Sequence, residues 1–230
     1  MIGTATVTRP EGILFQIKVG DPVFQGDVIE TTADGWVSIR FYDGMVFNLS
    51  GSARMALKNF PDGGTSQPAV FDVARGDFIF SSGKMAKAGR LEINTPVASI
   101  RGRTQFGGIG TLSLISLFFA ALEKVQASPS NTTYTDDELL PLDYTSEPHG
   151  SFELVTKETV PRHFFVADPG VTWSFRLSSS SELSVSQIAN SPARMEQLHA
   201  IQQNVLQTYS VGLQAMQGPT VSLAMPATTC

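Results

Sequence analysis

The stretch that decides the fold class is residues 36–57, WVSIRFYDGMVFNLSGSARMAL. Apolar and polar residues alternate on both sides of Asp43-Gly44, with the apolar set at Val37, Ile39, Phe41, Met45, Phe47 and Leu49. A period of two is typical of half-buried strands. Asp-Gly tolerates positive φ at both centres of a tight turn. The stretch therefore predicts a β-hairpin.

A Gly-Asp step occurs twice upstream of this hairpin, at Gly20-Asp21 and at Gly26-Asp27. Glycine permits a turn, and the Asp side chain caps backbone N–H groups. The two steps therefore predict two tight corners between short strands.

The alternation continues downstream through residues 71–73, 78–80 and 91–93 and stops at Thr95-Pro96, where we expect the chain to change direction. Arg75-Gly76-Asp77 matches an adhesion tripeptide, but we interpret it as an ordinary turn before the next strand. Gly107-Gly108-Ile109-Gly110 lacks the spacing of a nucleotide-binding loop and is interpreted as a flexible junction.

The second half of the chain changes character several times. Residues 127–150 predict a polar loop or linker, in which Asp136-Asp137-Glu138 lacks the ligand spacing of a calcium loop. Residues 151–190 predict a smaller β unit. Residues 191–213 predict an amphipathic helix that packs on the β domain, and residues 214–230 predict a disordered tail. The helix prediction rests on the spacing of Met195, Leu198, Ile201, Val205 and Tyr209.

The composition also indicates an all-β protein. Only 16% of the 230 residues are charged, and 20 Gly and 13 Pro indicate many turns between short elements. The hydrophobic fraction of 42% is sufficient for a core.

Charge and apolar runs exclude some partners. The net charge of −5 argues against nucleic acid and anionic membranes as partners, since binding to either needs clustered Lys and Arg. The longest apolar run, Leu112 to Leu122, is far shorter than the roughly 20 residues of a transmembrane helix. We interpret it as buried core, and its sequence is compatible with either a strand or a helix. No cleavable signal peptide is readable at the N-terminus.

No set of residues suited to catalysis or metal binding can be assembled. His149, His163 and His199 lie in different segments, and the single cysteine is the terminal Cys230. No G-x-S-x-G motif supplies a nucleophile. We therefore expect no enzyme activity, no cofactor and no metal.

Three motifs together resemble the FecR domain family. They lie in residues 19–31, which contain both Gly-Asp steps, in residues 41–45 and in residues 94–102. The family has G-D-x-V-x-x-G-D-x-I-x-T, F-x-D-G-S and T-P-x-A-x-I-x-V-R-G-T in this order. The chain departs from that pattern at Arg103, which follows Arg101-Gly102 where the family has threonine. We interpret the motif residues mainly as corners of the fold: Gly20, Asp21, Gly26, Asp27, Asp43, Gly44, Thr95, Pro96, Arg101 and Gly102.

The resemblance implies an all-β fold, either a FecR-like twisted β-sandwich or a short solenoid-like stack, followed by the smaller β unit and the C-terminal helix. It places the FecR-like domain at residues 1–106 and an apolar connecting segment at residues 107–126. The remainder resembles the extension found in long rhizobial-type repeat proteins.

The function that the resemblance implies is a non-catalytic binding or sensory module of a bacterial envelope or secreted protein. The implied partner is an envelope or surface protein or polymer, and the implied location is the periplasm, the cell surface or the exterior. The alternative is a structural N-terminal cap or spacer of a long adhesin-like protein. We expect a monomer. A binding module should expose an apolar or aromatic patch beyond its core, whereas a spacer need not.

Overall fold

The computed structural model describes residues 3–61, 67–81, 83–84, 89–102, 107–112, 135–141, 152–168, 170–177, 182–193 and 195–196. This part of the chain is mostly β, which confirms the predicted fold class. The strands are β1 (Ala5–Thr8), β2 (Leu14–Gln16), β3 (Val28–Thr31), β4 (Trp36–Arg40), β5 (Val46–Asn59), β6 (Ala69–Ser81), β7 (Leu91–Asn94), β8 (Ala98–Gly102), β9 (Gly107–Leu112), β10 (Thr135–Pro141), β11 (Phe152–Thr156), β12 (His163–Val166), β13 (Val171–Leu177) and β14 (Leu183–Ala189).

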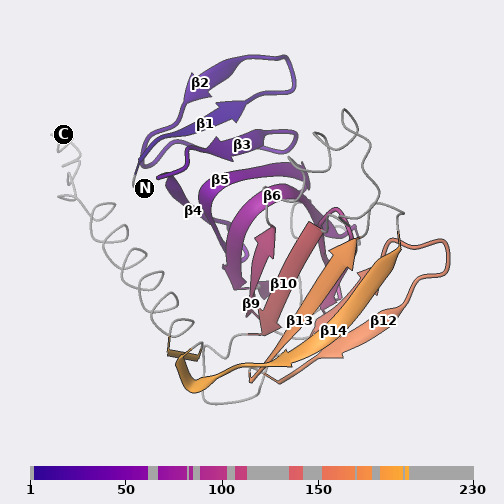
Figure 1. Ribbon diagram of the computed structural model, residues 1–230. Coiled ribbons are helices and arrows are strands. Elements are labelled where there is room, and N and C mark those ends of the chain that lie inside the picture. Colours follow the sequence, from indigo (N-terminus) through magenta and orange to yellow (C-terminus); the bar gives the residue numbers. More distant parts are fainter. Residues whose placement is uncertain are drawn as a thin grey trace, which may run out of the picture.

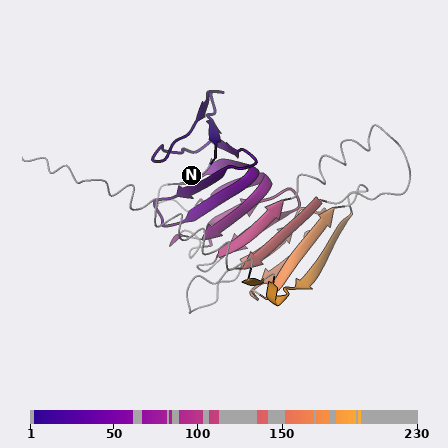
Figure 2. The same cartoon turned by 60° about the vertical axis from the view of Figure 1, so that its left-hand side comes forward.

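All of these strands belong to one hydrogen-bonded network with two branches that share β5 and β6. The first branch has the order β12-β11-β8-β7-β6-β5-β3-β1-β2. The second branch has the order β4-β5-β6-β9-β10-β13-β14. Figure 2 shows the strands side by side as a twisted ladder whose colours run from purple to orange.

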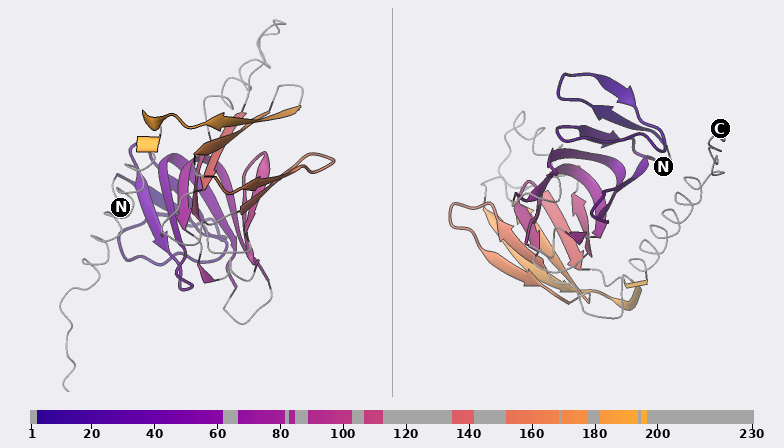
Figure 3. Two further views of the ribbon diagram at one scale, coloured as in Figure 1. Left: turned by 90° about the horizontal axis from the view of Figure 1, so that it is seen from below. Right: turned by 180° about the vertical axis from the view of Figure 1, so that it is seen from behind.

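The branches separate because β5 and β6 bend. Gly51 and Ser52 both have positive φ, 48° and 56°, and the β5–β6 register shifts between Ser50 and Arg54. Gly76, with φ 84°, lies on β6 at the same level. Bulges of this kind let a strand pass from one sheet to another. Figure 1 shows β5 and β6 arching, and Figure 3 shows the orange strands in two separate layers.

The core lies between the two layers and is rich in phenylalanine. Phe47 and Phe71 stack at 5.3 Å between ring centroids, and Phe80 meets Phe152 edge-on at 6.3 Å. The largest fully buried side chains include Phe47, Phe71, Phe78, Phe80, Phe152 and Phe175. The alternation seen in the sequence therefore turns one face of each layer toward a common apolar interior.

The hairpin predicted over residues 36–57 is confirmed, with Ile39 opposite Phe47. Its turn is longer than two residues. The Phe41 N–H donates to the Met45 carbonyl at 2.9 Å and the Gly44 N–H donates to the Phe41 carbonyl at 3.1 Å. Gly44 has φ 89°, whereas Asp43 does not have positive φ. The result is a turn closed by one left-handed glycine.

Three local interpretations of the sequence are corrected. Arg75-Gly76-Asp77 is not a turn but lies inside β6. The expected flexible junction forms β9, which pairs with β6 and β10. The acidic residues 136–138, expected in a loop or linker, lie in β10. Glycine-rich and acidic segments have low β-propensity, so pairing with neighbouring strands determines their conformation.

The strands predicted between residues 151 and 190 are present as β11 to β14, and they join the main network through β8 and β10. The predicted domain boundaries stay a prediction. Of the predicted helix, the Met195 N–H donates to the Ser191 carbonyl at 2.9 Å. Residues 197–213, the tail at 214–230, Arg103, His149 and the apolar run after Leu112 lie outside the described residues. In the part of the chain that is described, no helix has the length and apolar character needed to cross a bilayer.

Candidate binding cleft beside the Gly-Asp turns

The two Gly-Asp steps form the same turn twice. The Lys18 N–H donates to the Asp21 carboxylate at 2.7 Å, and the Asp21 N–H returns a bond to the Lys18 carbonyl at 3.1 Å. Phe24 and Asp27 make the identical pair of bonds at 2.7 and 3.1 Å. Each carboxylate therefore closes its own turn.

Positive φ at the third residue of both turns explains the glycines. Gly20 has φ 92° and Gly26 has φ 91°, values that L side chains rarely adopt. The structure thus places Gly20, Asp21, Gly26 and Asp27 at corners of the fold, which is the position that the sequence interpretation gave them.

The two turns differ in their surroundings. Asp21 is exposed, whereas Asp27 is fully buried and bonds to Arg9 at 2.7 Å between Nη1 and Oδ2. The Arg9 guanidinium also lies 5.1 Å from the ring centroid of Phe15 and 4.5 Å from that of Phe24. Arg9 was not identified from the sequence, because its partner is distant along the chain. The second turn is therefore anchored to the sheet, and the first projects from it.

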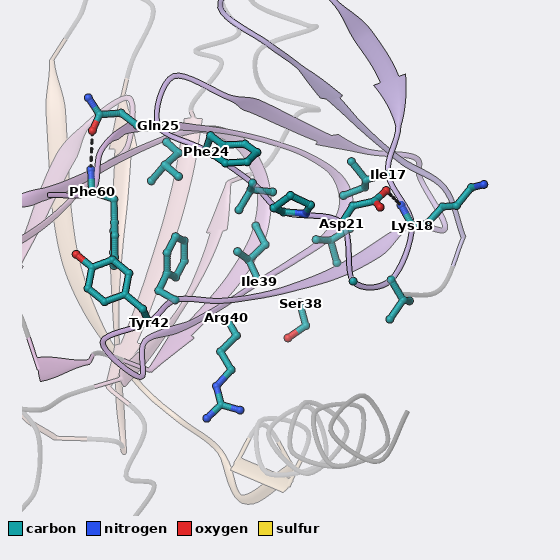
Figure 4. Close-up of a pocket in the computed structure, with 17 residues that line it drawn as sticks. Ile17, Lys18, Asp21, Phe24, Gln25, Ser38, Ile39, Arg40, Tyr42 and Phe60 are labelled. Atoms are coloured by element: carbon teal, nitrogen blue, oxygen red, sulfur yellow. Dashed lines mark hydrogen bonds between the residues drawn. The ribbon is translucent and has the colours of Figure 1, made fainter. Parts of the chain in front are cut away.

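A cleft of about 540 Å³ opens between this loop and β4. One wall is the continuous loop 17–25, and the other is the continuous run 37–42. Leu57 and Phe60 complete the lining. Figure 4 shows Ile39 directed into the cleft, with Phe24 on the opposite wall. The volume falls in the range typical of ligand sites, roughly 300 to 1,000 Å³.

The rim of the cleft carries large exposed apolar side chains. Val19 is 59% exposed, Phe24 is 53% exposed and Tyr42 is 61% exposed. The Phe60 ring stacks on Phe41 and meets Tyr42 edge-on, with centroids 4.5 and 5.1 Å apart. The rim is therefore an aromatic and aliphatic surface in addition to the buried core.

Hydrogen bonds fix the end of the cleft that carries these rings. The Phe60 N–H donates to Gln25 Oε1 at 3.4 Å, which ties the loop to the end of β5 (Figure 4). The Tyr42 hydroxyl donates to the Pro61 carbonyl.

The other motif residues do not line the cleft. Asp43 is buried and accepts a bond from the Met45 N–H at 2.9 Å. Thr95 is buried, and its hydroxyl donates to the Ala98 carbonyl at 2.9 Å in the turn before β8. Pro96 is exposed in the same turn, Arg101 pairs with Glu92 at 3.3 Å, and Gly102 is buried at the end of β8. Of the motif residues, only Gly20 and Asp21 line the cleft, beside Phe41 and Tyr42 of the hairpin.

Titratable groups elsewhere pair with neighbouring side chains. The Arg162 guanidinium donates to both carboxylate oxygens of Glu158, at 2.7 and 3.1 Å. These bonds, with one from the Thr156 hydroxyl, lower the pKa of Glu158. Arg162 also donates to the Leu183 carbonyl at 2.6 Å, so it joins the β11–β12 hairpin to β14. His163 pairs with Glu153 at 2.7 Å.

The described residues contain no group of three or more His, Cys, Asp or Glu side chains that could hold a metal ion. The cleft itself was not predicted. A usable signal was present, because residues 19–24 place Val19, Val23 and Phe24 in a turn-rich loop where polar residues are usual.

Comparisons with known proteins do not identify a family. No protein-family model matches the chain, and no curated protein matches it. Two crystal structures of a "putative anti-sigma factor" from Parabacteroides distasonis are similar, with 12% and 11% identity and TM-scores of 0.45 and 0.44. Each match covers 71% of this chain and 59% of the other, less than two thirds of its length. The FecR resemblance stays a prediction from the sequence.

Proposed function

We propose that the chain is a non-catalytic binding or sensory module that contacts another protein, or an envelope polymer, through the cleft. The observation that carries the proposal is the exposure of Val19, Phe24 and Tyr42 around an apolar cavity. Single exposed apolar residues are ordinary on a protein surface. Three of them around one cavity form the kind of patch that marks an interaction site.

The energetics of binding favour such a rim. Burial of apolar surface stabilises a complex by roughly 25 cal/mol per Å², and aromatic anchors contribute a large share of many interfaces. Phe24 is held in place by Arg9, and Tyr42 by Phe60 and Pro61. Ordered side chains lose less entropy on binding than mobile ones.

The resemblance to FecR domains supports a cellular location for this module. It favours a protein of the bacterial envelope, the cell surface or the exterior, and a partner in the same compartment. The proposal includes no cofactor and no catalytic step.

The test is a pull-down from bacterial envelope extract with the purified full chain, its Val19→Ser/Phe24→Ser variant and a Val160→Ser control. Val160 is 78% exposed and lies between β11 and β12, outside the cleft lining. We expect one captured component to be retained by the wild type and the control and lost with the cleft variant, while circular dichroism shows all three folded. Capture that is equal in all three folded proteins would contradict the proposal.

A second candidate, the structural cap or spacer, has its own supporting observation. Apolar side chains are also exposed near opposite ends of the first branch: Ile13 and Leu14 at 61% and 63%, and Val160 and Phe165 at 78% and 68%. A spacer that packs against neighbouring domains would use such ends. For this candidate, Leu14→Ser and Phe165→Ser should weaken the association of the chain with flanking domains, and the cleft variant should not.

A further inference from the structure

The outer face of the second branch carries a row of residues that is apolar at its centre. Directly paired residues lie on the same face of a sheet, so the register defines rows that cross the strands. One row runs from Ser38 on β4 through Asn48, Ile79, Ile109 and Leu140. Thr172 and Ile188, which pair with each other, continue it on β13 and β14. The next row is polar and includes Asp77, Thr111, Glu138, Ser174 and Ser186.

This outer face is covered, because its side chains are buried. Figure 4 shows that it points away from the cleft, since Ser38 lies on the opposite side of β4 from Ile39. Side chains on an uncovered face of an antiparallel sheet contact water. Ile79 is nevertheless only 4% exposed, Asn48 2% and Ser174 1%. Every described strand belongs to one of the two branches, with the core between them, so no described strand is left to cover this face.

The cover is apolar where it touches the face. Three polar atoms of the described residues on this face are buried without a hydrogen-bond partner, namely Trp36 Nε1, Asn48 Oδ1 and Ser174 Oγ. Buried polar groups are normally bonded, and a polar covering segment would offer partners to all three. Hydrocarbon side chains offer none.

We propose that residues 192–211 of the same chain cover this face as a helix that runs along the apolar row from β14 to β4. The segment starts at the correct end of the row. β14 ends at Ala189, and the Met195 N–H donates to the Ser191 carbonyl at 2.9 Å in a first helical turn. A segment tethered at the edge of a surface has a high effective concentration there. The inference concerns a different face from the cleft and does not rest on the proposed binding function.

The length of the segment agrees with the width of the branch. Six steps between neighbouring strands separate β14 from β4. At about 4.8 Å a step, the distance is about 29 Å. A helix of about 20 residues is about 30 Å long, so a helix that begins at residue 192 reaches β4 near residue 211. Its diameter of about 10 Å exceeds the spacing of about 7 Å between rows on one face, which explains why Ser174 of the neighbouring row is buried too.

The sequence of the segment supplies an apolar surface of the required shape. At 100° per residue, an arc of about 140° contains Met195, Leu198, Ile201, Val205, Leu206 and Tyr209. Gln202 is the one polar residue of the segment within this arc, and Glu196, Gln203 and Gln207 lie outside it. With the arc turned toward the sheet, the apolar stripe of the helix lies over the apolar row and the glutamines face water.

The first experiment locates the segment by paramagnetic broadening of amide NMR signals in the full chain, with Cys230→Ser as background. One spin label is attached at Glu196→Cys, near the start of the segment, and another at Gln207→Cys, near its far end. Both positions lie outside the apolar arc. We expect the label at residue 207 to broaden Ser38 and Asn48, and the label at residue 196 to broaden Ser174 and Ile188. The reverse pattern, or no broadening on this face, overturns the proposal.

A mixed sample distinguishes the chain's own segment from that of a second copy. Spin-labelled chain at natural isotope abundance is mixed with unlabelled chain that carries nitrogen-15. We expect no broadening at Ser38 or Asn48 in this mixture. Broadening there would show that a second copy occupies the face, and the proposal would be wrong.

A matched pair of variants tests the apolar contact. Leu198→Glu/Val205→Glu places two charges inside the arc, and Gln203→Glu/Gln207→Glu places the same two charges outside it. Trp36 is the reporter, because its Nε1 atom is buried on the outer face, whereas Trp173 packs against Phe164 at 5.0 Å between ring centroids.

In the arc variant we expect tryptophan emission to shift to longer wavelength and acrylamide quenching to increase, and in the control we expect neither change. Trp36→Phe should abolish the difference. Circular dichroism checks that both variants keep their β structure. Equal emission and quenching in the two folded variants overturns the proposal, and the spin-label measurement decides it independently if the arc variant does not fold.

Discussion

Gly76 on β6 lies so close to Ala53 on β5 that a Cβ on Gly76 would stand 2.3 Å from the Ala53 Cα. The contact occurs where both long strands bend from one layer into the other. A side chain at this point would push the bent strands apart. The absence of a side chain at residue 76 is therefore a condition for the two-layer fold.

Replacement of Gly76 tests this contact, and Gly12 offers a matched control. The two glycines have φ values of 84° and 85°, but a Cβ on Gly12 would meet nothing within 4 Å. Gly12→Ala should cost about 1 kcal/mol from backbone strain alone. Gly76→Ala should cost about 1 to 3 kcal/mol more from overpacking. Urea denaturation measures both, and equal losses would show that β5 and β6 separate easily at the bend.

The repeated turns allow a second matched comparison. Asp21→Ala removes an exposed carboxylate that bonds to one N–H, and it should cost about 1 kcal/mol. Asp27→Ala removes the same kind of bond and also the buried partner of Arg9, so we expect a loss of about 2 to 4 kcal/mol. Thermal and urea melts measure the difference. Equal costs for the two variants would mean that the Arg9–Asp27 pair contributes no net stability.

Gly44 provides a prediction about turn geometry. Its φ of 89° is strained for any β-branched residue, although a Cβ there would meet no atom within 4 Å. Gly44→Val should therefore destabilise the protein by about 1 to 3 kcal/mol. Gly44→Asn should cost less, because asparagine enters the left-handed region more readily. An unchanged melting temperature in Gly44→Val would contradict the assigned turn.

The pKa of Glu158 provides a prediction about pH. The hydrogen bonds from Arg162 and then Thr156 lower this pKa in the folded chain. The carboxylate therefore adds stability above its unfolded pKa, and the contribution is lost as the pH falls through its lower folded pKa. Carbon-detected NMR titration should find the Glu158 midpoint below that of a free glutamate. Arg162→Met should raise the midpoint toward the usual value, whereas Lys157→Met, which removes a charge without removing a hydrogen bond to Glu158, should change it less.

The strands that the sequence predicts well are those with a strong local signal. Alternation through Val37, Ile39, Phe47 and Leu49 identifies β4 and β5, and the strands at residues 152–189 follow from the same pattern. The Gly-Asp turns are predictable because each is closed by bonds within four residues. Local chemistry determines these elements, so a single sequence reveals them.

Features that depend on distant contacts could not be predicted in the same way. β9 is held by β6 and β10, and its glycine-rich sequence does not predict a strand. Arg9 follows β1 and Asp27 precedes β3, and the pairing of these two strands brings the two side chains together. The cleft forms because the loop 17–25 lies beside β4, and no pattern in the sequence indicates that these two segments are neighbours. The sequence interpretation put the motif residues at corners, whereas Arg101 and Gly102 lie in β8, and the neighbouring Val19 and Phe24 were not singled out.

The twin turns have a consequence for how this surface can diversify. Each turn is closed by its own glycine and carboxylate, and neither closing bond uses the side chain of Val19 or Val23. Substitutions at these two positions alter the lining of the cleft and leave the bonds that close both turns in place. A lineage of such proteins could exchange one ligand preference for another by a few point changes, without re-evolving the scaffold.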